Sequence, residues 1–162
     1  MYDDGFKDIL NIDISGVVVE LMKARSDEIR PEMTYEVMDV TDMTPLADNS
    51  FDIAIDKSTI DALLCAPKSN LLVGKMLKET QRILKPGGHY IAISYGEPEN
   101  RSHLFEMPFL HWEKREFALY DPEQEKKNQE QSQEEENKTE KVSSKHYIYI
   151  GKKLEGADVI SE

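Results

Sequence analysis

Three aspartates, Asp13, Asp39 and Asp56, each stand at the end of a short apolar run, and they are the first candidates for chemistry in this chain. An ionised carboxylate is an acceptor-only group and can take two hydrogen-bond donors at once. In an open parallel sheet, acids at the carboxyl ends of strands line the crevice in which a nucleotide-like ligand binds. The order and spacing of the three acids therefore predict a ligand site along one edge of such a sheet.

The segments that must position these acids alternate between strand and helix patterns. We expect strands over residues 7–14, 34–38, 51–55 and 89–95, and helices over residues 17–29, 60–64 and 70–84. Ser15 is the expected N-cap of the first helix, and Lys85-Pro86-Gly87-Gly88 ends the last one because proline cannot continue a helix. Two later segments, residues 112–120 and 145–152, alternate apolar and polar side chains, as an antiparallel pair would. The fold class expected is α/β, with a mostly parallel sheet that closes in an antiparallel C-terminal hairpin.

Composition limits the choice of partners. The chain has 162 residues and a formal net charge of −12, and no segment forms the Lys/Arg patch that phosphate recognition needs. We therefore expect neither a nucleic-acid partner nor, for lack of a long apolar run, a membrane span. An acidic surface favours basic protein partners, although the charge can equally serve solubility alone.

One domain is expected over residues 1–153, followed by a tail at 154–162. The Glu/Gln-rich segment 121–141 has almost no apolar residues and is expected to be a mobile loop. Cys65 is the single cysteine, so an intrachain disulfide is impossible; its apolar neighbours predict a buried side chain, and a reducing compartment fits best.

The segment Leu84-Lys85-Pro86-Gly87-Gly88, with the order of acids before it, resembles a class I S-adenosylmethionine-dependent methyltransferase. The likeness extends over residues 1–153. More narrowly, the chain is similar to the methyltransferases that modify lysines of translation elongation factor one-alpha, through Met1–Phe6, Asn11–Ser15 and Asp56–Leu63. The last of these stretches usually reads Asp-Lys-Gly-Thr-Leu-Asp-Ala in that group, and Ser58 here replaces its glycine.

The resemblance implies a set of residues that bind S-adenosylmethionine. Asp13, beside Ile14, would accept hydrogen bonds from the ribose hydroxyls, and Asp39 would lie near the adenine amino group. Val40 would offer its backbone N–H to the ring, and Asp56 would border the cofactor at the methyl end. The alternative for each strand-ending aspartate is a cap or turn former that binds no ligand.

Asp56 and Lys57 are the catalytic residues that the resemblance implies. Methyl transfer to an amine is a displacement on a sulfonium carbon, and it needs an uncharged amine aligned with the leaving sulfur. A nearby acid can orient that amine or help to remove its proton. A salt bridge between Asp56 and Lys57 is the structural alternative. Asp61 would either cap the short helix or contact substrate, and Tyr95–Pro98 would line the substrate entrance; no metal is expected.

In the resembled family, a strand with a Gly-rich loop comes before the segment that corresponds to Met1. We expect the present chain to lack that strand, to expose sheet edges, and to bind cofactor weakly or not at all. Two functions stay open at this point. One is cytoplasmic methyl transfer to a lysine of a basic protein substrate, and the other is a non-catalytic interaction module with the same fold. A nicotinamide-dependent dehydrogenase fits less well, because of the Pro-Gly-Gly turn and the antiparallel hairpin.

Overall fold

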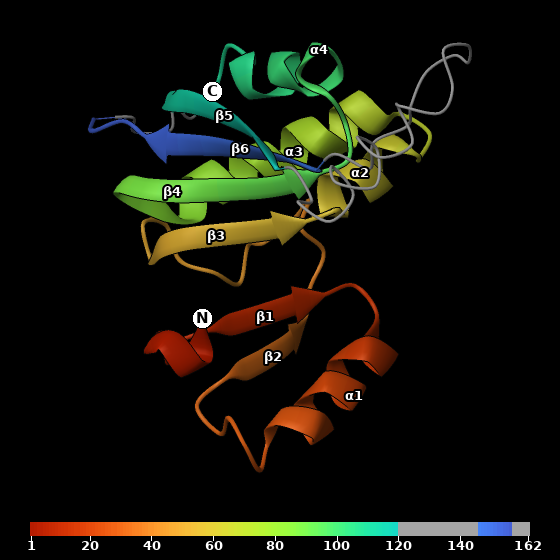
Figure 1. Ribbon diagram of the computed structural model, residues 1–162, viewed down its shortest axis with the longest axis vertical. Helices are drawn as coiled ribbons and strands as arrows, with labels where there is room; N and C mark the ends of the chain where they lie inside the picture. Colours follow the sequence, from red (N-terminus) through yellow and green to blue (C-terminus); the bar gives the residue numbers. More distant parts are fainter. Residues whose placement is uncertain (120–145, 157–162) are drawn as a thin grey trace, which may run out of the picture. The chain divides into compact units, whose positions relative to one another are not determined.

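The computed structural model describes residues 1–119 and 146–156, and the chain divides into two compact units, residues 1–47 and residues 48–162 (Figure 1). The expected loop at 121–141 and most of the expected tail lie outside the described residues. The prediction of a single domain over residues 1–153 stays a prediction.

The first unit is a two-stranded parallel sheet with one helix. Its elements are η1 (Tyr2–Asp4), β1 (Leu10–Asp13), α1 (Gly16–Ser26) and β2 (Thr34–Val37). The two strands pair in register from Leu10 opposite Thr34 to Asp13 opposite Val37. Ser15 caps α1 as expected, because its side chain accepts a hydrogen bond from the Val18 N–H at 3.4 Å. The strands and the helix are each shorter than the sequence pattern predicted.

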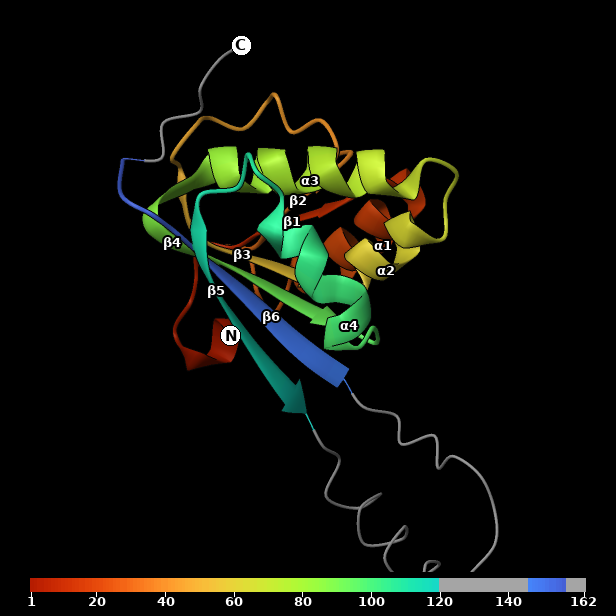
Figure 2. The same cartoon turned by 90° about the horizontal axis from the view of Figure 1, so that it is seen from above.

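The second unit contains a four-stranded mixed sheet in the order β3-β4-β6-β5. Its elements are β3 (Phe51–Lys57), α2 (Thr59–Leu64), α3 (Ser69–Ile83), β4 (Leu84–Ser94), α4 (Pro98–Arg101), η2 (Ser102–Glu106), β5 (Trp112–Leu119) and β6 (His146–Lys153). β3 and β4 are parallel, whereas β6 is antiparallel to both β4 and β5. Helices α2 and α3 lie on the same face of this sheet (Figure 2). The expected antiparallel C-terminal pair is therefore confirmed.

Aromatic side chains form the centre of the second unit. Phe105 stacks on Tyr149 with ring centroids 5.2 Å apart and on Tyr90 at 5.8 Å, and Trp112 lies 5.9 Å from Tyr90. All four residues are buried, and the indole N–H of Trp112 donates to the Phe105 carbonyl at 2.9 Å. This packing holds η2 against β4, β5 and β6, because the stacked rings come from each of these elements.

The Pro-Gly-Gly segment lies within a strand and not in a turn before one. β4 begins at Leu84, which pairs with Phe51, and the next pairing joins His89 to Ile53. The residues between Leu84 and His89 therefore form an irregularity within the strand, in which Gly87 has a φ of 79°. A positive φ favours glycine because it has no Cβ. The strand consequently starts five residues earlier than the alternating pattern alone predicted.

The expected burial of Cys65 was wrong. Cys65 is exposed, because it lies at the end of the short helix α2 rather than beneath it. In β3, Ile53 and Ile55 are 40% and 47% exposed. Within the described residues β3 pairs with β4 alone, so its other edge has no hydrogen-bonded strand.

Candidate functional site

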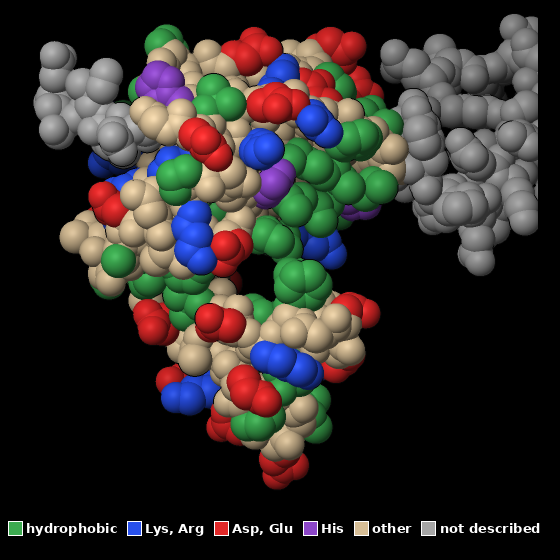
Figure 3. All heavy atoms as spheres, turned by 90° about the vertical axis from the view of Figure 1, so that its left-hand side faces the viewer, with side chains coloured by type: hydrophobic (Ala, Val, Ile, Leu, Met, Phe, Trp, Pro, Cys, Tyr) green, Lys and Arg blue, Asp and Glu red, His purple; other side chains and the backbone are tan. Residues whose placement is uncertain are grey.

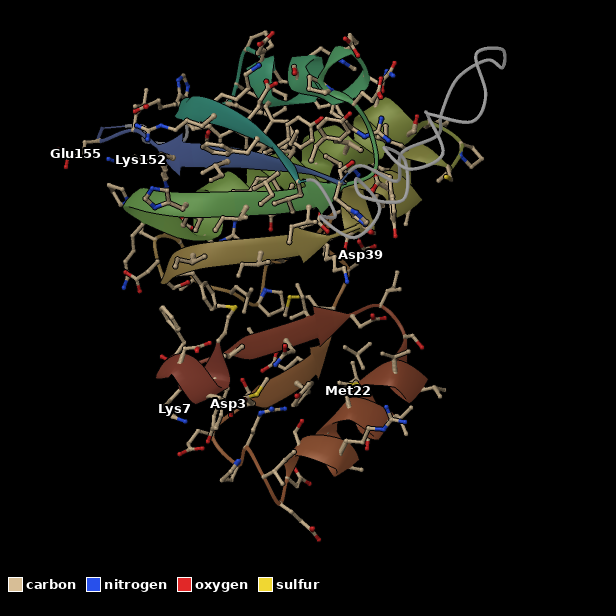
Figure 4. All side chains as sticks on the ribbon, viewed as in Figure 1. Asp3, Lys7, Met22, Asp39, Lys152 and Glu155 are labelled. Carbon is tan, nitrogen blue, oxygen red and sulfur yellow. The ribbon has the colours of Figure 1, made fainter. Side chains whose placement is uncertain are left out.

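Two of the three strand-ending acids lie together in the first unit. β1 and β2 are parallel, so their carboxyl ends reach the same side of the sheet, and the Met38 N–H donates to the Asp13 carbonyl at 3.0 Å. Asp39 follows directly after Met38, on the side toward which the arrows of both strands point (Figure 4). Two of the three acids thus lie at one sheet edge, and the ligand site expected there stays a prediction.

Each of these carboxylates has one oxygen engaged by the backbone. Oδ1 of Asp13 accepts the Ser15 N–H at 2.8 Å, and Oδ1 of Asp39 accepts the Thr41 N–H at 2.8 Å. Both are short local turns of the kind that aspartate favours. Both aspartates therefore act as turn formers, which was the alternative to ligand binding. In each exposed carboxylate, Oδ2 has no donor among the described residues.

The residues present fit the adenosine part of S-adenosylmethionine. The local turns fix the Asp13 and Asp39 carboxylates while one oxygen of each stays available to a ribose hydroxyl or an adenine amino group. Within residues 1–119 and 146–156, no acceptor pairs with the Val40 N–H, which could donate to the adenine ring. The Ile14 side chain is 72% exposed immediately after Asp13. The roles expected for these four residues stay predictions.

Asp56 lies in the second unit, where its carboxylate accepts hydrogen bonds from the protein itself. Its carboxylate is 5% exposed and accepts the Thr59 N–H at 2.7 Å, the Ile60 N–H at 3.1 Å and the Tyr90 hydroxyl at 3.1 Å. Two of these donors are backbone groups at the start of α2, which have no partner within the helix. Burial, and then the charge of Asp56, raise the pKa of Tyr90, so its hydroxyl stays a donor.

These contacts favour a structural role for Asp56, with partners other than the expected Lys57. Lys57 is exposed, and its backbone pairs with Ile93 at the end of β3. No ion pair joins Asp56 to Lys57 in the described part of the chain. The catalytic roles of both residues, and the cofactor contact of Asp56, stay predictions.

Asp61 accepts hydrogen bonds from three different residues in the second unit. Its Oδ1 accepts the Ser94 hydroxyl at 2.6 Å and the Arg101 guanidinium at 3.0 and 3.2 Å, and its Oδ2 accepts the Tyr95 N–H at 3.1 Å. Partial burial raises the pKa of Asp61, but the bonds from Ser94, Tyr95 and Arg101 together lower it below its ordinary value. Asp61 thus joins α2 to the loop that leaves β4.

Ser58 explains why the resembled group has glycine at this position. Its φ is 67° and its ψ is 4°, which is the left-handed region that glycine occupies without strain. The Ser58 N–H donates to the Ile93 carbonyl at 3.0 Å, but its hydroxyl makes no capping bond to α2. The sharp turn between β3 and α2 is kept here at the cost of a strained residue.

Three other features were sought in the described part of the chain: a metal site, a membrane-spanning helix and a basic patch. It contains no group of three or more His, Cys, Asp or Glu side chains that could hold a metal ion, and none of its helices is long and apolar enough to span a bilayer. On the face shown in Figure 3, Lys and Arg side chains are scattered among Asp and Glu and form no continuous basic patch. That surface offers no obvious track for a phosphate backbone.

Comparison with known families decides the class of protein. Residues 1–92 match the family described as a methyltransferase domain. The chain belongs to this methyltransferase family. The expected recognition, fold class and S-adenosylmethionine-dependent methyltransferase class are thereby confirmed.

Curated relatives of this methyltransferase domain include the eEF1A lysine and N-terminal methyltransferase of Bos taurus, 43% identical over 99 residues. That match takes in 60% of this chain but only 14% of the relative. EEF1A lysine methyltransferase 4 of Bos taurus is 31% identical over 116 residues, 67% of this chain and 45% of that protein. The methyltransferase domain thus spans a small part of the first relative and less than half of the second.

Solved structures agree on the fold. The geranyl diphosphate C-methyltransferase of Streptomyces coelicolor A3(2), in complex with S-adenosyl-L-homocysteine, has a TM-score of 0.61 at 13% identity, covering 94% of this chain and 65% of that one. The [4+2]-cyclase SpnF has a TM-score of 0.66 at 15% identity, covering 95% and 70%. A fold shared by a C-methyltransferase and a cyclase does not determine the reaction.

The hydrogen bonds made by the side chains of Ser94, Arg101 and Tyr149 were not predicted from the sequence. The Tyr149 hydroxyl donates to the Gly96 carbonyl at 2.6 Å, although the alternating pattern of β6 indicated only a strand residue. Arg101 follows the strand by seven residues, and nothing in its neighbours marks it as a partner of Asp61. Such long-range pairs carry no periodic pattern in a single sequence.

Proposed function

We propose that this methyltransferase domain transfers a methyl group from S-adenosylmethionine to a lysine amine of a protein substrate similar to elongation factor 1A. The observation that carries the proposal is the 43% identity with a relative named for eEF1A lysine and N-terminal methylation. The acidic net charge of −12 supports a basic protein segment as the substrate. A cytoplasmic location belongs to the same proposal, because an exposed lone cysteine suits a reducing compartment.

The proposed cofactor site lies in the first unit. S-adenosylmethionine, when bound, supplies an electrophilic methyl group on a sulfonium centre. Asp13 and Asp39 hold the adenosine part through the carboxylate oxygens that their local turns leave available. The substrate amine loses its proton to solvent before its nitrogen attacks. Asp56 fixes the start of α2 rather than taking that proton, since its oxygens already accept three hydrogen bonds.

A calorimetric titration of S-adenosylhomocysteine into the full chain tests the proposal, beside Asp13→Ala and the control Asp8→Ala. Asp8 is an exposed acid that precedes β1 and lies outside the proposed site. The expected result is weak but saturable binding, which falls about tenfold or more in Asp13→Ala and not in the control, because the ribose would lose a charge-assisted hydrogen bond. Transfer of labelled methyl to elongation factor 1A then tests the substrate. A folded sample that shows no binding would refute the proposal.

One observation favours a second function, that of a non-catalytic interaction module. Ile53 and Ile55 are exposed on β3, whose outer edge has no partner among the described residues. Open edges of this kind can add a strand from another chain. Binding of a protein partner with no affinity for S-adenosylhomocysteine would support this function instead.

A further inference from the structure

The loop that leaves β4 is fastened at several points, although it contains no long element. The Tyr95 N–H is held by Asp61, and the Gly96 N–H donates to the Ser94 hydroxyl at 2.9 Å. On the other side, the Gly96 carbonyl accepts the Tyr149 hydroxyl at 2.6 Å. We call these contacts, together with the Asp61–Arg101 ion pair at 3.0 Å, the loop lock.

Gly96 is part of the loop lock because of its size. A Cβ placed on this residue would collide with the Arg101 side chain, whose Cγ would lie at 2.7 Å. Any larger residue would therefore require the Arg101 side chain, which is bonded to Asp61, to move. The lock thus depends on four side chains and on one position where a side chain must be absent.

The lock fixes the backbone from which the Tyr95 side chain extends. Tyr95 is 58% exposed, and its ring lies 4.3 Å from the His146 ring. Ser94 pairs with Tyr147, so the start of β6 lies beside the end of β4. The carboxyl end of a parallel strand is the ligand side of such a sheet, and Tyr95 presents an exposed aromatic ring there.

We propose that Tyr95 forms one wall of the substrate lysine site and that Asp61 is the positioning residue that holds it there. This inference rests on the proposed function and adds to it a residue that contacts the substrate. An aromatic face attracts an ammonium group, and the carbon stem of a lysine packs well along such a ring. Glu97, exposed two residues further on, adds negative charge to the same loop.

The test uses the full chain and a short glycine–serine peptide with one central lysine, beside the same peptide with norleucine in place of lysine. Ring signals of Tyr95, assigned with Tyr95→Phe, are followed by nuclear magnetic resonance during titration. The lysine peptide is expected to shift these signals and the norleucine peptide is not. Tyr95→Ala is expected to weaken lysine-peptide binding roughly threefold to tenfold, as loss of one exposed cation–π contact would.

Two variants break the lock while they keep Tyr95. Asp61→Asn leaves one acceptor oxygen where four donated hydrogens now converge, and Gly96→Ala displaces Arg101. Both are expected to speed hydrogen exchange at the Tyr95 and Gly96 amides and to weaken peptide binding to the level of Tyr95→Ala. Gly74→Ala, whose new Cβ meets only ordinary contacts, is the matched control and should change neither quantity.

The outcomes separate the inference from the function on which it rests. Equal binding of the two peptides, or unchanged Tyr95 ring signals during the titration, would show that Tyr95 does not form a wall of the lysine site. Wild-type peptide affinity in both lock variants would overturn the positioning role of Asp61. Absence of S-adenosylhomocysteine binding with a normal peptide response would refute methyl transfer while leaving the lysine site in place.

Discussion

Replacing Ser58 with glycine should stabilise the protein, which is an unusual direction for a substitution beside a candidate site. Ser58 has a φ of 67°, and this left-handed conformation costs a residue with a Cβ about 1–2 kcal/mol. Glycine avoids that cost but loses about 0.5–1 kcal/mol through the greater freedom of its unfolded chain. The net gain expected for Ser58→Gly is therefore about 0.5–1 kcal/mol.

The contacts of Ser58 allow this simple sum. Its hydroxyl makes no capping bond, so glycine removes no side-chain interaction of that kind, and its backbone N–H keeps the bond to the Ile93 carbonyl. For a chain of this size, such a gain corresponds to a rise in Tm of roughly 1–4 °C.

Urea denaturation and thermal melting of wild type, Ser58→Gly and Ser58→Ala measure the effect. Alanine keeps the Cβ and removes only the hydroxyl, so its free energy of unfolding should stay within about 0.5 kcal/mol of wild type. Equal stabilisation by alanine and glycine would show that the hydroxyl, not the left-handed backbone, is responsible. A loss of stability in Ser58→Gly would refute the reasoning outright.

Three further results are expected. Tyr90→Phe removes a buried hydroxyl that donates to a buried carboxylate and should lower the free energy of unfolding by about 1–3 kcal/mol, read from urea denaturation. Asp61 has a lowered pKa in the folded state, so its carboxylate stabilises the fold above about pH 4 and loses that effect as the pH falls through its folded-state pKa. Asp61→Asn should therefore reduce the loss of unfolding free energy between neutral and acidic pH. An unchanged pH dependence in this variant would contradict the role given to Asp61. Gly151→Ala should cost roughly 1–3 kcal/mol, because its Cβ would meet the Trp112 ring at 2.7 Å, whereas Gly74→Ala in α3 should raise stability by up to about 1 kcal/mol in the same measurement.

The elements with a strong local pattern were predictable from sequence. α3 was expected over residues 70–84 and is found at Ser69–Ile83, because its apolar side chains repeat at helical spacing. The hairpin of β5 and β6 followed from alternation, and the Ser15 cap from the chemistry of serine at a helix start. Each of these features is determined by residues close together in the chain.

The features that failed depend on tertiary context. Cys65 has apolar neighbours, yet its burial depends on what packs against the end of α2, which no periodicity reveals. The irregularity at Gly87 lies within a strand, whereas local turn propensity placed it before one. The donors to the Asp56 carboxylate were not predicted from sequence, because they include the distant Tyr90 besides Thr59 and Ile60. The catalytic role of Asp56 stays a prediction.

The division of the chain into two compact units affects how loss of function would be observed. Asp13 and Asp39 belong to residues 1–47, and Asp61 and Tyr95 belong to residues 48–162. Compact units of one chain can open with different free energies. The smaller unit could thus unfold locally while the larger one keeps its secondary structure, and a circular dichroism spectrum would then report a mostly native protein. For any substitution that abolishes binding, hydrogen exchange should therefore be measured residue by residue in each unit. A global melting curve would miss the unfolding of one unit, and the loss of binding would then be blamed on the altered side chain.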